Sequence, residues 1–328
     1  MTETGARRDV VIVGAGPAGM TAAVYAGRAL RSTLLFEKGI PGGQLNETDR
    51  IENWPGFADP IPAPDLMAAL RAQVERLGAE IVQDDVLGIE PGVSFHRVTA
   101  AHRVVEARTV ILAPGSRPKE LAAEGAARLK GRGVSYCATC DGFFYQGKSV
   151  VEVGAGDAGL MEALFLTRYA DSISVIVRHP KDDPRAIRAS GRLRERVLTH
   201  PKIRFLWNRE VVEVVGERDV VAVRLRRLED GGIEEVPADG IFVNVGHRPQ
   251  TEFLRGGVPL DPNGYIVTDA RLRTRIPGIF AAGDARVDAH RYAQAIIAAG
   301  EGATAALEAE QYLSELPGRR SSNSREGG

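Results

Sequence analysis

Cysteine is scarce in this chain of 328 residues: only Cys137 and Cys140 are present. Because there is no other cysteine, the sequence excludes a second structural disulfide and any metal site built from four thiolates. So few cysteines in a long chain indicate a reducing compartment, where a thiol pair is more often catalytic than structural. We therefore expect a cytoplasmic protein.

Net charge and long apolar runs are also lacking. The formal net charge is −1, which gives no electrostatic reason to expect nucleic acid or an anionic membrane as a partner. No stretch approaches the roughly 18 apolar residues of a membrane-spanning helix, and residues 1–8 lack the apolar core of a secretory signal. We therefore expect no nucleic-acid and no membrane partner.

Glycine, in contrast, is abundant, and part of it forms a recognisable loop at Gly14–Gly19. The apolar segment 9–13 precedes this loop, an alanine-rich helical stretch follows it, and a second apolar segment, 32–36, ends at Glu37. This order is typical of a dinucleotide-binding unit, in which the glycines let the backbone approach a pyrophosphate at a helix N-terminus. Glu37 would accept hydrogen bonds from ribose hydroxyls. The alternative is an ordinary strand–turn–helix corner.

The same order of elements occurs again at Gly154–Gly159. The apolar segment 149–153 precedes this second loop, a helical stretch over 157–170 follows it, and a further strand is expected at 172–177. We interpret the repetition as an internal duplication of one nucleotide-binding unit. The sequence therefore predicts an α/β fold with two Rossmann-like domains, each of the three-layer ββα type.

A late acidic residue, Asp284, supports FAD as the ligand of the first unit. It ends the apolar segment 279–283 and precedes a long helix predicted over 291–313. An acid in this place can bind a ribitol hydroxyl, and the helix dipole can act on the flavin ring. Taken alone, the acid would more often be a turn residue or a helix cap. The polar segment 317–328 is expected to be a disordered tail.

The two cysteines are separated by two residues and followed at once by Asp141. This spacing favours thiol–disulfide exchange, in which one thiolate attacks a substrate disulfide and the other resolves the mixed disulfide. Asp141 could move the proton, or it could cap a helix. Zinc is the competing interpretation, but none of the 6 histidines stands at finger spacing, and we expect no metal.

Together these motifs closely resemble the low-molecular-weight, bacterial-type thioredoxin reductases, over nearly the whole chain up to Leu313. The resemblance rests on six segments: Gly14–Gly19, Pro41–Leu45, Glu52–Gly56, Cys137–Gly142, Gly246–Pro249 and Ala282–Asp284.

The resemblance implies the pyridine nucleotide-disulfide oxidoreductase architecture. An FAD-binding domain would comprise residues 1–116 and 246–316, and an inserted NAD(P)H-binding-like domain, 117–245, would carry the dithiol. Family members are homodimers in which the inserted domain rotates between flavin and substrate contact. The residues implied to bind FAD are Gly14, Gly16, Pro17, Ala18, Gly19, Glu37, Lys38, Gly43, Gln44, Leu45, Asn53, Val86, Ala113, Gly115, Gly283, Asp284, Gln294 and Ala295.

The resemblance also implies catalytic roles. Cys140 would face the flavin, Cys137 would attack thioredoxin, and Asp141 would donate the proton. A flavoprotein that reduces thioredoxin is therefore the expected function. The alternative is a flavin-containing redox sensor that is not an enzyme. The presence of Asp141 beside an intact cysteine pair argues against this alternative.

The second nucleotide site departs from the family pattern. Its glycines, Gly154, Gly156 and Gly159, keep a spacing that allows a phosphate turn. The arginines that clamp the 2′-phosphate of NADPH in the family are replaced by Arg178–Pro180, with His179 in place of one arginine, and an insertion precedes Arg188. Glu152 interrupts the apolar strand before the loop. These changes predict weak or absent NADPH binding and slightly favour another donor, such as reduced ferredoxin.

Overall fold

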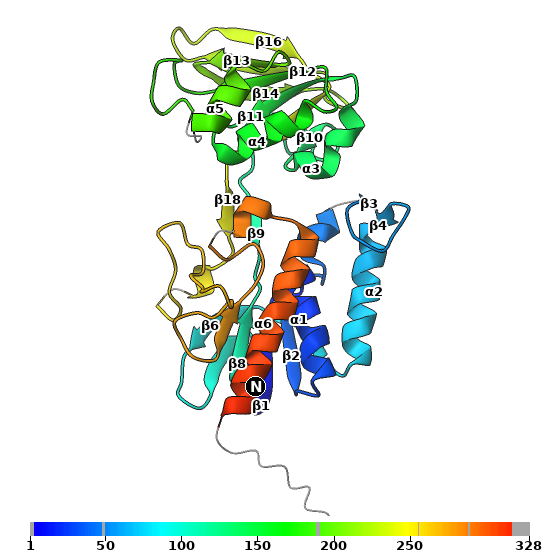
Figure 1. The fold of residues 1–328 in the computed structure, drawn as a ribbon, viewed down its shortest axis with the longest axis vertical. Helices are drawn as coiled ribbons and strands as arrows, with labels where there is room; N and C mark the ends of the chain where they lie inside the picture. Colours follow the sequence, from blue (N-terminus) through cyan, green and yellow to red (C-terminus); the bar gives the residue numbers. More distant parts are fainter. Residues whose placement is uncertain (1–2, 48–49, 188–190, 255, 288, 317–328) are drawn as a thin grey trace, which may run out of the picture. The chain divides into compact units, whose positions relative to one another are not determined.

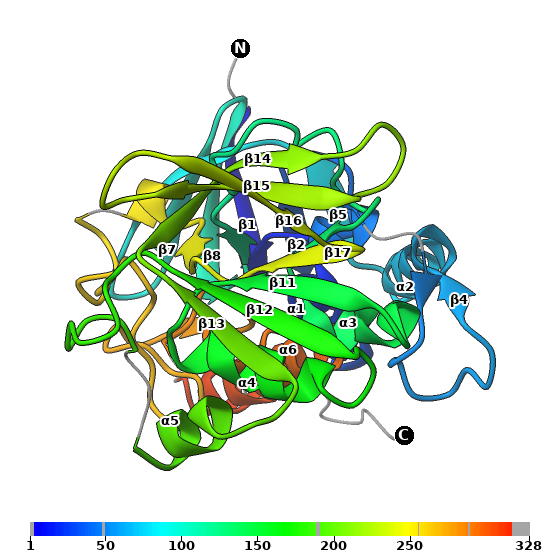
Figure 2. The same cartoon turned by 90° about the horizontal axis from the view of Figure 1, so that it is seen from above.

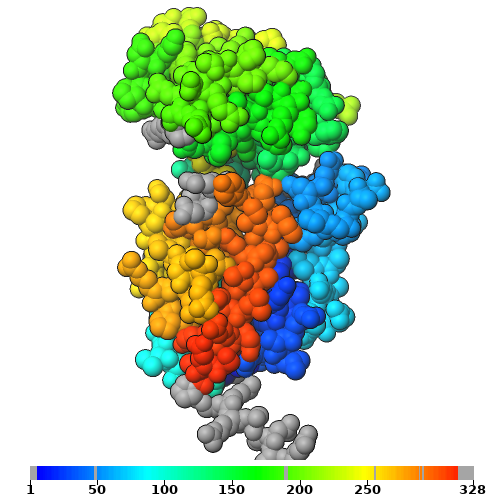
Figure 3. Space-filling model, in the orientation of Figure 1, coloured from blue at the N-terminus to red at the C-terminus, as the bar shows by residue number. Residues whose placement is uncertain are grey.

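The computed structural model describes residues 3–47, 50–187, 191–254, 256–287 and 289–316. The tail predicted at 317–328 lies outside the described residues. The chain divides into two compact units: one comprises the residues up to Arg117 and those from Arg248 onward, and the other is Pro118–His247. Both ends of the chain therefore belong to the same unit, as the blue and red segments of Figure 3 show.

A mixed sheet in the order β5-β2-β1-β8-β7-β6, with β19 also paired to β8, forms the centre of the first unit. The strands β5, β2, β1, β8 and β19 run parallel, whereas β7 and β6 are antiparallel additions at one edge. The bounds are β1 (Glu3–Val13), β2 (Thr33–Glu37), β5 (Glu80–Gln83), β6 (Val86–Glu90), β7 (His96–Ala100), β8 (Arg103–Leu112) and β19 (Ile279–Ala281).

The apolar segment 9–13 before the first glycine loop is the end of β1. Val10 and Ile12 enter one hydrophobic cluster, and Val11 and Val13 enter another, so successive side chains fill the cores on opposite faces of the sheet. This burial on both faces explains why the segment has no polar alternation. The predicted parallel, nucleotide-binding type of α/β fold is confirmed.

The described residues of the first unit form the α-helices α1 (Pro17–Arg28), α2 (Ala63–Arg76) and α6 (Ala295–Glu315). Figure 1 shows α6 lying beside α1, although the two are far apart in the sequence. The contact is close because a Cβ at Gly302 would lie 2.0 Å from the Ala18 carbonyl oxygen. Arg31 adds a two-pronged ion pair to Glu310, with distances of 2.5 and 2.6 Å.

The second unit contains a five-stranded sheet in the order β10-β17-β11-β12-β13, in which every pair is parallel. A separate antiparallel sheet, β14-β15-β16, accompanies it (Figure 2). The bounds are β10 (Val134–Ser135), β11 (Ser149–Val153), β12 (Ser172–Val177), β13 (Ile203–Trp207), β14 (Arg209–Val215), β15 (Ala222–Arg227), β16 (Ile233–Pro237), β17 (Gly240–Val243), α3 (Ala138–Asp141), α4 (Asp157–Leu166) and α5 (Gly191–Leu198).

The two units repeat one strand order. The run β13-β12-β11-β17 of the second unit corresponds to β5-β2-β1-β8 of the first, with a glycine loop and a helix after the third strand in each run. The duplication inferred from the two loops is thus visible in the sheets. A glycine loop that follows a central parallel strand lies at the carboxyl edge of its sheet, where ligands bind in this class of fold.

The remaining elements are short. Segments β9 (Ser116–Pro118) and β18 (His247–Pro249), where the chain passes between the units, pair with each other. The others are β3 (Arg50–Ile51), β4 (Ile61–Pro62) and the 3-10 turns Gly43–Glu47, Gly142–Tyr145, Glu252–Leu254 and Ala289–Tyr292. No helix within the described parts of the chain is long and apolar enough to cross a membrane.

Candidate redox and nucleotide-binding site

The first glycine loop requires its glycines for steric reasons. Gly14 has a φ of 100°, and a Cβ there would lie 2.2 Å from the Ala113 carbonyl oxygen. At Gly19 the added carbon would lie 1.7 Å from the Gly14 carbonyl oxygen, so strand and helix meet without space for a side chain. Gly16 is the N-cap of α1 and has no side-chain cap, and Pro17 follows it. The helix therefore begins with backbone amides that no capping side chain satisfies, as an anion site requires.

Glu37 lies at this loop, as the sequence predicts. Its carboxylate oxygens accept hydrogen bonds from the Ala15 amide at 2.8 Å and the Gly39 amide at 3.0 Å. These bonds hold an acid at the end of β2 beside the first glycines. The Lys38 ammonium group donates to the Gln250 side-chain oxygen at 3.1 Å, and Gln250 donates to the Pro114 carbonyl oxygen at 2.9 Å, beside the predicted Gly115.

A second group of predicted residues meets around Gln44. The Gln44 amide nitrogen donates to the Ser116 carbonyl oxygen at 2.8 Å and to Asp284 Oδ2 at 3.3 Å. Burial, with a contribution from Glu301, raises the pKa of Asp284 to about 6. The Ser116 hydroxyl is buried and has no hydrogen-bond partner within the part of the chain that the structure describes. Sequence reasoning missed this serine, which directly follows Gly115.

The other predicted flavin residues lie in several places within the first unit. Gly43 approaches Gly16, since a Cβ on Gly43 would lie 3.1 Å from the Gly16 Cα. Gly283 approaches Ala18 in the same way, at 3.1 Å from its Cβ. Val86, in contrast, is buried in the hydrophobic cluster on one face of the sheet.

Two further predicted residues pair at the start of α6. The Asn53 amide donates to the Gln294 side-chain oxygen at 3.0 Å, and Gln294 is the N-cap that precedes Ala295. Leu45, from the loop that also contains Gln44, is half-buried against the core of the unit.

The two cysteines form a disulfide whose Cα atoms are 5.3 Å apart. Cys137 is the extended N-cap of the short helix α3, and Cys140 lies within that helix. Cys137 is half-buried and Cys140 is exposed. Within the described ranges, no group of three or more His, Cys, Asp or Glu side chains is placed to hold a metal ion.

Asp141 ends the helix that carries the dithiol, and it is oriented by a residue that the sequence did not reveal. The Ser135 hydroxyl donates to Asp141 Oδ2 at 2.6 Å and accepts the Cys137 amide at 3.1 Å. Burial raises the pKa of Asp141, and the Ser135 hydrogen bond partly opposes this shift. A carboxyl group whose pKa lies above its ordinary range can serve as a proton donor nearer neutral pH.

The second glycine loop has the geometry of the first. Gly154 has a φ of 129°, and a Cβ there would lie 2.2 Å from the Asn244 carbonyl oxygen. At Gly159 the added carbon would lie 2.4 Å from the Gly154 carbonyl oxygen, and Gly156 is an N-cap of α4 without a side-chain bond. Glu152 does not face solvent at this loop: its side chain is fully buried beneath it.

The region predicted to contact a 2′-phosphate contains several ion pairs. His179 Nδ1 lies 3.4 Å from Asp183, and Asp183 also binds Arg185 at 2.6 Å. Arg178, which is largely exposed, lies 3.9 Å from Glu210. Arg188 falls outside the described residues.

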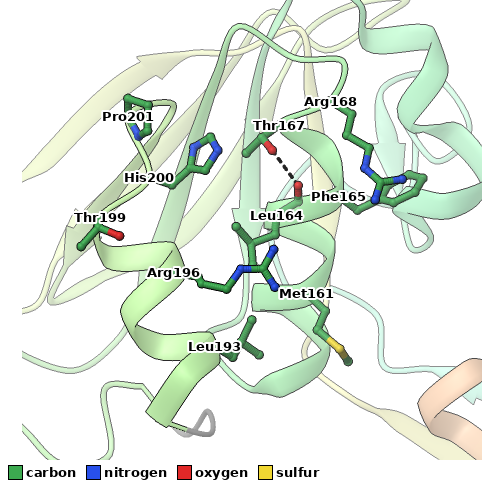
Figure 4. A pocket seen from close by; sticks show the side chains of 10 residues that line it. All are labelled: Met161, Leu164, Phe165, Thr167, Arg168, Leu193, Arg196, Thr199, His200 and Pro201. Atoms are coloured by element: carbon green, nitrogen blue, oxygen red, sulfur yellow. Dashed lines mark hydrogen bonds between the residues drawn. The ribbon is translucent and has the colours of Figure 1, made fainter.

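A separate pocket of about 530 Å³ lies between α4 and α5 (Figure 4). Its lining combines apolar side chains, such as Met161 and Leu193, with Arg168 and Arg196. None of the predicted site residues lines it.

Comparisons with known proteins place this geometry in a family. A model described as pyridine nucleotide-disulphide oxidoreductase matches residues 8–302. A thioredoxin reductase of Streptomyces coelicolor is 44% identical over 312 residues, covering 94% of this chain and 95% of the relative. The solved thioredoxin reductase of Streptococcus pyogenes superposes with a TM-score of 0.87 at 36% identity, covering 95% of this chain and 99% of that chain.

Two other similar proteins carry different electron donors in their names. An NADPH-dependent thioredoxin reductase of Arabidopsis thaliana is 40% identical, covering 93% of this chain and 58% of the relative. A ferredoxin-flavin thioredoxin reductase of Clostridium acetobutylicum is 27% identical with a TM-score of 0.51, covering 96% of this chain and 100% of that chain. The chain thus belongs to the pyridine nucleotide-disulphide oxidoreductases and, within them, to the thioredoxin reductases.

Proposed function

We propose that this chain reduces the disulfide of thioredoxin with electrons that pass from bound FAD to the Cys137–Cys140 pair. The observation that carries the proposal is the disulfide in the short helix that ends at Asp141, an acid with a raised pKa. A structural disulfide has no need of a buried proton donor beside it. We infer from the family to which the chain belongs that the substrate is oxidised thioredoxin.

The first unit fits FAD on its own geometry. The cradle at Gly14–Gly19 would receive the pyrophosphate, and Glu37, held by two backbone amides, would accept from ribose hydroxyls. Asp284 and the buried Ser116 hydroxyl supply further polar groups near Gln44. FAD, when bound, would supply the two electrons that convert the disulfide into a dithiol. The other implied flavin residues are proposed on the resemblance.

The exchange itself uses groups of this chain. In the reduced enzyme the Cys137 thiolate attacks one sulfur of the thioredoxin disulfide, forming a mixed disulfide and breaking the substrate S–S bond. Asp141 protonates the thiolate that leaves. The Cys140 thiolate then attacks Cys137 sulfur, which releases the second thioredoxin thiol, takes up one more proton and restores the Cys137–Cys140 disulfide.

Substitution of Gly19 tests the flavin assignment. We expect Gly19→Ala to lose most bound FAD, because the new Cβ would lie 1.7 Å from the Gly14 carbonyl oxygen and the loop must move. Gly300→Ala on α6 is the matched control, since its Cβ would meet nothing within 4 Å. The ratio of flavin to protein absorbance after purification measures retention. Full retention in Gly19→Ala, or wild-type protein that stays colourless when FAD is added, would refute the assignment.

Two kinds of electron donor are candidates: a nicotinamide nucleotide and a protein such as reduced ferredoxin. The steric match between the second loop and the first supports a nucleotide such as NADPH. The loss of clamp arginines, with Arg185 already paired to Asp183, favours a weak nucleotide site and a donor such as reduced ferredoxin. Because Glu152 is buried and accepts a hydrogen bond from Asn244, we do not expect it to repel a bound pyrophosphate.

We expect NADPH to bind about 10- to 10⁴-fold more weakly than to an intact clamp, with little preference over NADH. One to two lost charge-assisted hydrogen bonds, at about 1.5–3 kcal/mol each, account for this range. His179→Arg with Asp183→Asn should restore a preference for NADPH, since the neutral Asn no longer competes for the new guanidinium. Anaerobic titration of the bound flavin with NADPH, NADH and reduced ferredoxin measures how readily each donor reduces it. Rapid bleaching of the wild-type flavin by micromolar NADPH, with NADH far slower, would contradict this prediction.

A steady-state assay with thioredoxin separates the enzyme from a redox sensor, because multiple turnovers require a catalyst. A homodimer and a cytoplasmic location are proposed on the resemblance and the cysteine content. The solution mass of the purified protein tests the first.

A further inference from the structure

An acidic residue that the proposed chemistry does not use, Glu152, lies in the central strand β11. Its side chain is completely inaccessible to solvent. Strand alternation places it on the face of Val150, which packs in the same cluster as Leu160 of α4 and Ala138 of α3. Glu152 Oε1 accepts a hydrogen bond from the Asn244 amide nitrogen at 2.9 Å, whereas Oε2 has no hydrogen-bond partner among the described residues.

Asn244 connects this carboxyl group to the dithiol. It follows β17, and its side-chain nitrogen also donates to Glu162 Oε2 at 2.7 Å. The same Glu162 oxygen accepts the backbone amide of Ala138 at 3.0 Å. Ala138 directly follows Cys137. A continuous set of hydrogen bonds therefore runs from the core strand, through Asn244 and Glu162, to the backbone between the two cysteines.

The acidic side chains along this path shift one another's pKa values. Burial, and then the charge of Glu162, raises the pKa of Glu152 well above its ordinary value, which favours the protonated carboxyl group. Burial also raises the pKa of Glu162, the amides of Asn244 and Ala138 oppose that shift, and Asp141 adds repulsion. At Glu152 the neighbouring strands β12 and β17 contribute only apolar partners, Val175 and Phe242. The titratable groups involved are therefore Glu152 on β11, Glu162 on α4 and Asp141 on α3.

We propose that Glu152 and Asn244 are positioning residues for the dithiol that act through Glu162. The Glu152 carboxyl group accepts one N–H of the Asn244 amide and so directs the other toward Glu162, and Glu162 holds the Ala138 amide. While both amides donate, they favour the charged form of Glu162, and that charge disfavours ionisation of the Cys137 thiol. When the Asn244 donation is lost, Glu162 takes up a proton more easily and the thiolate forms at lower pH. This inference depends on the proposed function in one respect only: the Cys137–Cys140 disulfide must be reducible.

The test is the pH profile of Cys137 alkylation by iodoacetamide in reduced, FAD-bound enzyme, with each thiol resolved by mass spectrometry. We expect Glu152→Val and Asn244→Ala to raise the alkylation rate at acidic pH about 2- to 10-fold, the change produced when the pKa of the Cys137 thiol falls by up to about one unit. Glu162→Gln should act in the same direction, and adding Glu152→Val to it should cause no further change. The matched control, Glu152→Gln, keeps an acceptor oxygen and should retain the wild-type profile.

Three results would overturn the proposal: a wild-type profile in both Glu152→Val and Asn244→Ala, additive shifts in the double variant, or an equal shift in Glu152→Gln. Flavin content and circular dichroism establish whether each variant is folded. If Glu152→Val does not fold, Asn244→Ala still tests the same hydrogen-bonded path. The assay contains no thioredoxin. Wild-type enzyme that fails to reduce thioredoxin would therefore refute the proposed function and leave this inference standing.

Discussion

Cys137→Ser should abolish thioredoxin reduction while leaving FAD bound and reducible by its donor. A serine hydroxyl does not ionise near neutral pH and cannot form a mixed disulfide, and the Cys137–Cys140 bond is lost with it. Cys140→Ser should also be inactive for a different reason: without the resolving thiol, a mixed disulfide between Cys137 and thioredoxin should accumulate. Mass spectrometry of the non-reduced protein, together with steady-state turnover, distinguishes the two variants.

Thr139→Ser is a matched control for both cysteine variants. It lies between the cysteines and keeps the hydroxyl that is 3.3 Å from Cys137 Sγ, so it should retain turnover. Wild-type turnover in Cys137→Ser would show that the role assigned to this cysteine is wrong. A trapped adduct through Cys140 rather than Cys137 would exchange the two roles.

Asp141→Asn should slow thioredoxin reduction about 10²- to 10⁴-fold, the usual scale for a lost general acid. The amide retains an acceptor for the Ser135 hydroxyl but cannot protonate a leaving thiolate. Because burial raises the pKa of Asp141, the protonated acid persists above the ordinary carboxyl range and is lost as the pH rises through the raised value. The wild-type exchange rate should therefore fall with rising pH in that range, and this fall should be absent from Asp141→Asn.

The control for this variant is Asp171→Asn, an exposed acid of the same unit that should retain full activity. Rates are measured under single-turnover conditions, so that flavin reduction does not limit them. Equal pH profiles in wild type and Asp141→Asn would exclude Asp141 as the proton donor and leave it a structural role beside Ser135.

The two glycine loops could be predicted because part of their steric requirement is local, between Gly14 and Gly19 and between Gly154 and Gly159. The close approaches of Ala113 to the first loop and of Asn244 to the second come from distant parts of the chain. The ends of the elements were less predictable. Strand β1 begins at Glu3 rather than near residue 9, because its first part pairs with β8, which no local pattern reveals. Helix α6 begins at Ala295 rather than near 291, because Gln294 is extended, with φ −122° and ψ 140°, and its side chain binds Asn53.

Residues that meet from distant parts of the chain were the hardest to find by sequence. The late apolar segment and the helix after it suggested Asp284, and the resemblance suggested Gln44, whereas Ser135, Glu162 and Asn244 carry no motif and were missed. Glu152 did stand out as an acid in an apolar strand. Its orientation could not be predicted, because both faces of that strand are buried and its partner Asn244 is far away in the sequence.

The central claim is that electrons pass from FAD through Cys137 and Cys140 to thioredoxin, and one measurement tests it most directly. Flavin absorbance is followed anaerobically after donor-reduced enzyme is mixed with oxidised thioredoxin. In wild-type enzyme the oxidised spectrum should return as thioredoxin thiols appear, two for every two electrons that leave the enzyme, and it should not return on the same timescale in Cys140→Ser. Equal return in both proteins, or thioredoxin that stays oxidised while the wild-type flavin reoxidises, would contradict the account.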